Sequence, residues 1–104
     1  RVETPAPDLP SSPTRLVGVR PNPFNPRTTV TFYVARATEV RLAVHDATGK
    51  LVTALATGRY DPGSYSVVWD GTSSSGEAVA SGVYFVRMTA GRGVVSSAKV
   101  ALVR

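Results

Sequence analysis

The sequence contains no cysteine, which excludes a disulfide scaffold, a cysteine-ligated zinc site and a thiol nucleophile. It also has no run of 18 apolar residues, so it predicts no membrane-spanning helix. The formal net charge is +5, yet no two basic residues are adjacent. Nucleic-acid binders usually cluster their positive charge, so these scattered arginines argue against a nucleic-acid partner. An acidic lipopolysaccharide remains a candidate partner for such a basic surface.

Residues that could carry chemistry are few and isolated. His45 is the only histidine and falls on an outward strand position, where a surface role is the usual one. The serines at 73–75 have no nearby base to activate a nucleophile. Asp70 and Glu77 are candidates for holding one Ca²⁺ ion with loop carbonyls, against the simpler interpretation that they cap turns. We therefore expect no enzymatic activity and no cofactor.

The first 14 residues differ in composition from the rest. Residues 1–14 hold four of the eight prolines, which predicts a semi-rigid linker or extended N-terminal arm. Residues 15–104 have the composition of one folded domain. Because the chain begins with arginine and has no apolar signal region, we expect a piece of a longer precursor or a mature product.

From residue 15 onward the hydrophobic pattern has a period of two, which indicates strands and no long helix. Turn signals separate the strands at Asp46–Lys50, Gly58–Gly63 and Gly91–Gly93. At most one turn of 3₁₀ helix is expected, at Val79–Ser81. The pattern predicts an all-β fold, a single immunoglobulin-like antiparallel β-sandwich of about seven strands with Trp69 as a core aromatic. The expected strands are Arg15–Val19, Thr28–Val34, Glu39–Asp46, Leu51–Ala56, the segment through Tyr65, Val67 and Trp69, Val83–Thr89 and Val94–Val103.

The most informative stretch is Asn22-Pro-Phe-Asn-Pro26, which a β-branched run follows at once. Each proline restricts its own backbone and pushes the preceding asparagine out of the α region. Asparagine side chains can replace missing backbone contacts in such a loop. We expect a stiff loop that presents Phe24 as a docking or packing residue and then begins a strand.

Five segments in this order resemble a bacterial Ig-like family. The family is the one shared by the Ig-like domain of the flagellar hook-capping protein and the C-terminal sorting domains of the type IX secretion system. The segments are Asn22–Phe32, Val44–Lys50, Gly63–Gly71, Gly76–Tyr84 and the terminal apolar strand that ends in Leu102-Val-Arg104. The sequence departs from the family at His45, where tyrosine is usual.

This resemblance implies a non-catalytic sorting or anchoring domain that directs a secreted protein through the type IX system to the cell surface. The chain ends two residues after Leu102, as such a terminal label would. The implied partner is the secretion machinery, and the implied location is extracellular, reached through the periplasm. The motif and interaction residues carried by the resemblance are Asn22, Pro23, Phe24, Asn25, Pro26, Trp69, Asp70, Gly71, Gly82, Tyr84, Lys99, Leu102 and Arg104.

Two other functions remain open on the sequence. The first is a structural subunit of an extracellular filament or sheath, assembled from copies of itself when the N-terminal arm adds a strand to a neighbour's sheet edge. The second is a carbohydrate-binding module, which would need Tyr33, Tyr60 and Phe85 to form an outward aromatic patch.

Overall fold

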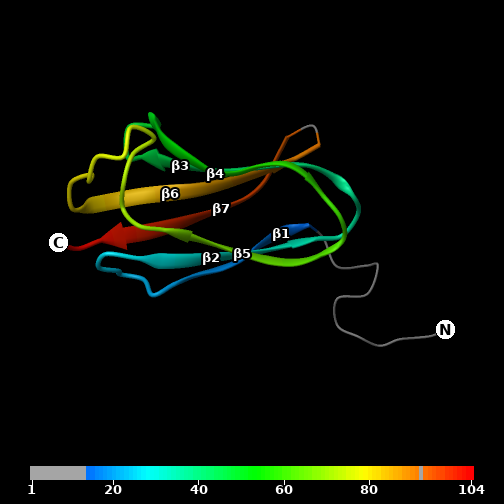
Figure 1. The fold of residues 1–104 in the computed structure, drawn as a ribbon, viewed down its shortest axis with the longest axis horizontal. Helices are drawn as coiled ribbons and strands as arrows, with labels where there is room; N and C mark the ends of the chain where they lie inside the picture. The colour runs from blue at the N-terminus through cyan, green and yellow to red at the C-terminus, as the bar shows by residue number, and fades with distance from the viewer. Residues whose placement is uncertain (1–13, 92) are drawn as a thin grey trace.

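The computed structural model describes residues 14–91 and 93–104, and in this part of the chain it contains seven strands and no helix (Figure 1). The strands form two antiparallel sheets that face each other, a three-stranded sheet of order β1-β2-β5 and a four-stranded sheet of order β4-β3-β6-β7. The strands are β1 (Arg15–Arg20), β2 (Thr28–Val34), β3 (Thr38–Asp46), β4 (Leu51–Tyr60), β5 (Gly63–Trp69), β6 (Gly82–Ala90) and β7 (Gly93–Leu102).

Alternation along the strands explains the core. Side chains at every second position of a strand point to the same face, so each apolar series supplies one inner surface. The predicted inward series of β2, β3 and β6 are buried, as are Val100 and Leu102 of β7. Trp69 is buried at the end of β5. The prediction of an immunoglobulin-like β-sandwich of seven strands is therefore confirmed.

One local expectation was wrong. The strand β4 continues to Tyr60, past the predicted turn at Gly58, because β3 begins at Thr38 and the pairing runs on to the pair Thr38–Tyr60. The segment 79–81 contains no 3₁₀ turn. The N–H of Val79 instead donates to the Gly71 carbonyl at 3.0 Å, across the loop at residues 70–81.

The outer face of β3 also differs from expectation. The alternation places Ala43 outward, yet it is buried. Its single methyl group lies in a central strand, directly between Ala54 of β4 and Arg87 of β6 in the register. A short side chain between two neighbouring strands is covered more readily than a long one.

The aromatic patch that a carbohydrate-binding module would need does not form. Tyr33 lies on β2 in the three-stranded sheet, whereas Phe85 lies on β6 in the other sheet. Tyr60 turns toward the core, where its ring centroid is 5.5 Å from that of Phe32 and 4.8 Å from that of Tyr65. These aromatic residues belong to sheet packing, so the flat platform that a carbohydrate-binding module of this kind needs is missing here.

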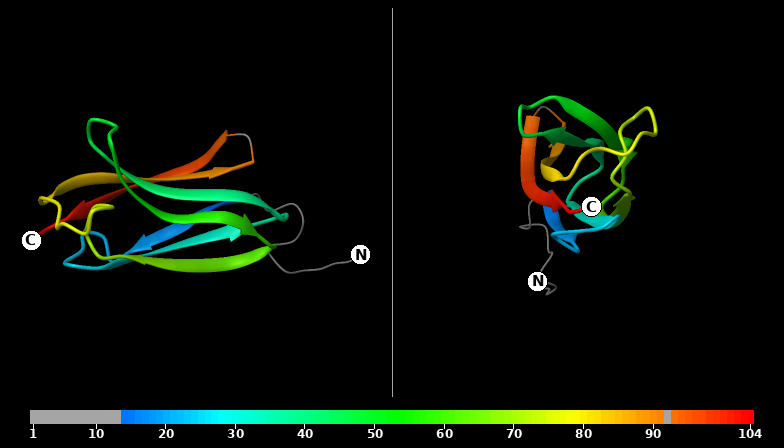
Figure 2. Two further views of the ribbon diagram at one scale, coloured as in Figure 1. Left: turned by 45° about the horizontal axis from the view of Figure 1, so that its top comes forward. Right: turned by 90° about the vertical axis from the view of Figure 1, so that its left-hand side faces the viewer.

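The antiparallel connections bring several distant segments to one end of the sandwich. The loop at residues 21–27, the loop at residues 70–81 and the C-terminus all lie at the left in Figure 1, and the right-hand view of Figure 2 looks onto this end. Within the described residues, no helix has the length and apolar character needed to cross a membrane.

Candidate functional site

The loop at residues 21–27 attaches to the open edge of β7 through four hydrogen bonds. The backbone N–H of Phe24 donates to the carbonyl of Ala101 at 2.9 Å, and the N–H of Val103 donates to the carbonyl of Phe24 at 3.0 Å. The Asn22 amide continues this pairing, because its Nδ2 donates to the Lys99 carbonyl and its Oδ1 accepts from the N–H of Ala101, both at 3.0 Å. The loop therefore replaces a neighbouring strand along the last part of β7, and it protects an edge that would otherwise stay unpaired.

Phe24 closes the core at this end. Its side chain is only 2% exposed, and its ring centroid lies 5.3 Å from that of Trp69. Trp69 in turn meets Tyr84 edge-to-face at 5.4 Å. The polar atoms of both partners are satisfied, since the Trp69 indole donates to the Thr72 carbonyl at 2.9 Å and the Tyr84 hydroxyl donates to the Ala80 carbonyl at 2.6 Å. Aromatic pairs of this geometry stabilise beyond their buried area.

A tight turn follows Trp69. Asp70 Oδ1 accepts from the hydroxyl of Thr72 at 2.6 Å and from its N–H at 3.2 Å. Gly71 then has a φ of 79°, in the left-handed region that favours glycine. A Cβ at Gly71 would lie 2.9 Å from Arg104 Nη2 and 3.4 Å from the Pro26 carbonyl oxygen. The turn thus needs glycine for both its backbone conformation and its close neighbours.

Arg104 links this turn to the C-terminal segment. Its Nε donates to the Val79 carbonyl at 2.6 Å, and its Nη2 donates to the Gly71 carbonyl at 2.8 Å. Its backbone N–H donates to the hydroxyl of Ser81 at 2.9 Å. One guanidinium group therefore holds both ends of the loop at residues 70–81, which arginine can do because it presents several donors in a rigid plane.

The remaining predicted residues lie at the same end, mostly facing outward. Pro23, Asn25 and Pro26 are exposed around the buried Phe24, and the Lys99 side chain is exposed on β7. Gly82 begins β6, and Leu102 is buried beside the loop, where it forms an isolated parallel bridge with Phe24. We call this end of the sandwich the latch end. It consists of the loop at residues 21–27, the segment from Trp69 to Tyr84, and the C-terminal residues Lys99–Arg104.

Sequence reasoning missed two residues of the latch end. The Thr28 hydroxyl is buried and donates to the Pro21 carbonyl at 2.8 Å, so it holds the base of the loop. A signal was available, because the alternation puts Thr28 on the same inward face as Val30, and buried polar groups are hydrogen-bonded. Ser81 accepts from the Arg104 N–H, and no sequence pattern pointed to that contact.

Asp46 and Asp70 act as turn caps. Hydrogen bonds from the Thr48 side chain and the Lys50 N–H lower the pKa of Asp46, and the Thr72 hydroxyl lowers the pKa of Asp70. Within residues 14–91 and 93–104, no group of three or more His, Cys, Asp or Glu side chains is placed to hold a metal ion. The Asp70 carboxylate is engaged by Thr72 instead, which agrees with the interpretation of turn capping.

These two aspartates predict an acid-sensitive stability. Each has a pKa below the ordinary 3.8 in the folded state, so each contributes stability above that value and loses it as the pH falls through the lowered pKa. We expect the urea midpoint of unfolding to decrease as the pH falls below about 4. Thr72→Val should make that decrease shallower by removing the main hydrogen bond to Asp70. An unchanged pH profile in this variant would contradict the assigned role.

Asn22→Ala should weaken the attachment of the loop. The substitution removes two side-chain hydrogen bonds to β7, each of which is worth about 0.5–1.5 kcal/mol, so we expect unfolding to become easier by about 1–3 kcal/mol. Asn25→Ala is the matched control, because Asn25 is exposed in the same loop and its side chain has no hydrogen bond with the described residues. Equal effects of the two substitutions in urea unfolding would show that Asn22 does not act through β7.

The fold and the latch end define a class, an Ig-like domain whose last strand is held by a proline-containing loop and a terminal arginine. The sequence matches the family model of the FlgD Ig-like domain over residues 22–93, which is more than half of the chain. The chain therefore belongs to the FlgD Ig-like domain family, the first of the two branches named by the sequence resemblance. The match does not include β1 or the part of β7 beyond residue 93.

Two solved structures share the fold. The dimeric latent PorU from Porphyromonas gingivalis superposes with a TM-score of 0.73 at 22% identity, over 85% of this chain and 9% of that one. FlgD from P. aeruginosa superposes with a TM-score of 0.56 at 23% identity, over 72% of this chain and 57% of that one. This chain thus spans less than two thirds of either protein. No curated protein sequence matches the chain.

Proposed function

We propose that this chain is a non-catalytic C-terminal sorting or anchoring domain, which directs a secreted protein through the type IX system to the cell surface. The observation that carries the proposal is the latch end. Motifs from four separate parts of the chain meet there, and Leu102–Arg104 is one of them. Membership of the FlgD Ig-like domain family and the five resembling segments support a domain that is recognised by other proteins.

The latch end has buried residues that stabilise it and exposed residues that are available for recognition. Phe24, Trp69 and Leu102 are buried and hold the shape of this end, whereas Asn25 and Lys99 are exposed on it. A rigid scaffold that presents a shaped loop is the common arrangement for a binding surface. In the proposal, the secretion machinery contacts the exposed part and the buried part keeps it in one conformation.

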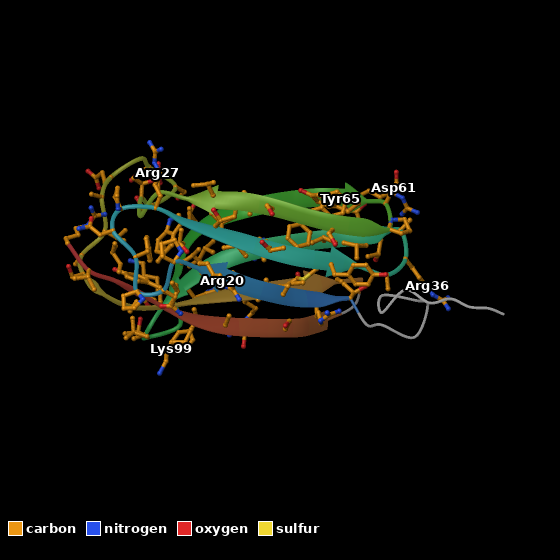
Figure 3. The ribbon with its side chains drawn as sticks, turned by 90° about the horizontal axis from the view of Figure 1, so that it is seen from below. Arg20, Arg27, Arg36, Asp61, Tyr65 and Lys99 are labelled. Atoms are coloured by element: carbon orange, nitrogen blue, oxygen red, sulfur yellow. The ribbon has the colours of Figure 1, made fainter. Side chains whose placement is uncertain are left out.

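Variants of exposed residues test whether the secretion machinery contacts the latch end. Arg27→Glu combined with Asn25→Ala changes the exposed side of the latch end, while Arg36→Glu changes an equally exposed arginine at the opposite end (Figure 3). In a secreted cargo that carries this domain, the first variant should accumulate in the periplasm. The Arg36 variant should reach the surface like the parent.

Folding must be measured on the same variants, because cargo with an unfolded domain would also be retained. Removal of residues 98–104 is not a usable test for this reason, since it would unfold the domain. In urea unfolding, both charge variants should keep the parent's free energy of unfolding within about 0.5 kcal/mol, as surface substitutions usually do. Normal surface delivery of the folded Arg27→Glu/Asn25→Ala variant would contradict recognition at the latch end.

The alternative is a structural subunit of an extracellular filament or sheath, with copies of the chain joined through the N-terminal arm. The arm's residues 1–13 lie outside the described residues, so this stays a prediction. Next to that arm, the Thr14 hydroxyl accepts from the N–H of Ala35 at 2.9 Å, which supports an arm that would extend from this point. Deletion of residues 1–13 should then abolish polymers while the monomer stays folded, and polymers that persist would reject the alternative.

A further inference from the structure

A hollow lies on the outer face of the three-stranded sheet, away from the latch residues. It has a volume of about 400 Å³ and is lined by Val17, Gly18, Arg20, Thr29 and Thr31. An irregularity in the pairing of β1 with β2 creates it. Leu16 pairs with Phe32 and Gly18 pairs with Thr31, so Val17 is the extra residue of a β-bulge. Bulges commonly re-aim side chains next to binding sites.

Glycine keeps the hollow open. A Cβ built at Gly18 meets no atom within 4 Å, and the φ of this residue lies outside the left-handed region. Neither packing nor backbone geometry therefore requires glycine at this position. The space above it is bounded by the side chains of its neighbours on β1 and β2.

The described strand positions on the outer face of this sheet are basic. These positions hold Arg15 and Arg20, hydroxyl residues and two exposed valines, Val17 and Val68, and none of them is Asp or Glu. Arg15 lies over the ring of Tyr33, with Cζ 5.7 Å from the ring centroid. The Arg20 side chain, labelled in Figure 3, forms no hydrogen bond or ion pair with the described residues, so its guanidinium is available beside the hollow.

We propose that this hollow binds a sugar unit that carries a carboxylate or phosphate group. Thr29 and Thr31 are two apart on one strand, so both side chains lie on the face of the hollow. The Thr31 hydroxyl shares a hydrogen bond with the Ser66 hydroxyl at 3.3 Å, and because a hydroxyl has one donor and two acceptor sites, both threonines can still exchange hydrogen bonds with sugar hydroxyls. Arg20 supplies a bidentate donor for the anionic group, and Val17, which is 54% exposed, offers an apolar contact for the C–H face of a sugar ring. The volume lies in the range of small-molecule sites.

This site is independent of the proposed sorting function, because it lies on a different surface and uses none of the latch residues. It also differs from an aromatic platform, since the hollow contains no aromatic residue. Acidic polysaccharide would thus contact the basic surface at one specific site. General electrostatic attraction would instead be spread over all the arginines.

Titration of the full chain with digalacturonate, glucose 6-phosphate and the neutral sugar maltose, followed by amide chemical shifts in NMR, tests the proposal. We expect shifts confined to residues 17–20 and 29–31, with maltose binding at least about tenfold more weakly because it cannot pair with Arg20. Gly18→Ile should abolish binding of all three sugars by filling the hollow. Arg20→Gln should weaken only the acidic ones, by about tenfold.

Arg87→Gln is the matched control, since Arg87 is exposed on the other sheet and should leave binding unchanged. Because Arg20 is exposed, its variant should fold normally, which keeps the test valid if Gly18→Ile does not fold. Shifts spread over all arginines and equally reduced by Arg87→Gln would overturn the proposal. So would a hexaglutamate peptide that binds the hollow as tightly as digalacturonate, because acidic protein side chains would then be the ligand.

Discussion

Phe24→Ala should lower the free energy of unfolding by about 3–5 kcal/mol, the largest effect that we expect from any single substitution in the loop at residues 21–27. The ring is almost wholly buried and contacts Trp69, so its removal leaves a cavity in the core at the latch end. A domain of this size has only about 5–15 kcal/mol of stability in total. Thermal and urea unfolding of the purified chain measure the loss.

Phe85→Ala is the matched control for this prediction. Phe85 is 36% exposed on the outer face of β6, so its truncation removes contacts without opening a cavity in the core. We expect it to cost no more than about 1 kcal/mol. If Phe24→Ala cost as little, the ring would not be a core residue in solution, and the closed latch end would be wrong.

Gly71→Ala should destabilise the domain by about 2–4 kcal/mol, from two causes. The positive φ costs about 1–2 kcal/mol for any residue with a Cβ, and displacement of the Arg104 guanidinium weakens its hydrogen bond to the Gly71 carbonyl, which is worth about 1.5–3 kcal/mol. The neighbouring Pro26 carbonyl oxygen, at 3.4 Å from the added Cβ, is near ordinary contact distance, so the contact with Arg104 accounts for the crowding.

Gly76→Ala separates these two causes. Gly76 has a similar φ of 87°, but a Cβ there would meet nothing within 4 Å. It should therefore cost only the backbone term of about 1–2 kcal/mol. In urea unfolding, the excess cost of Gly71→Ala over Gly76→Ala should vanish in an Arg104→Ala background. An excess that persists there would contradict the contact with Arg104.

Much of the fold was predictable from the sequence, because apolar residues alternate with polar ones along each strand and this pattern is visible locally. The alternation of Val30, Phe32 and Val34 needs no partner strand to be visible, and Asp46 with Gly49 signals a turn by its own chemistry. Strand ends were less predictable. The extension of β4 to Tyr60 depends on pairing with β3, which no local pattern contains.

For the candidate site, the sequence predicted which residues belong to it but not how they are arranged. The resemblance pointed to Phe24, Trp69, Gly71 and Arg104 as separate motif residues, but not to their contact with one another. Their assembly depends on the antiparallel connections that bring residues 24 and 101 together, so it becomes visible only in the fold. The hollow above Gly18 depends on a shift in strand register, which single residues do not reveal.

Delivery of a foreign cargo measures the proposed function most directly. A periplasmic reporter enzyme fused upstream of residues 1–104 would be expressed in a bacterium with a working type IX system and in the same strain without it. We expect the reporter on the cell surface in the first strain and in the periplasm in the second. Retention in the periplasm of both strains, with the domain folded, would contradict a sorting role.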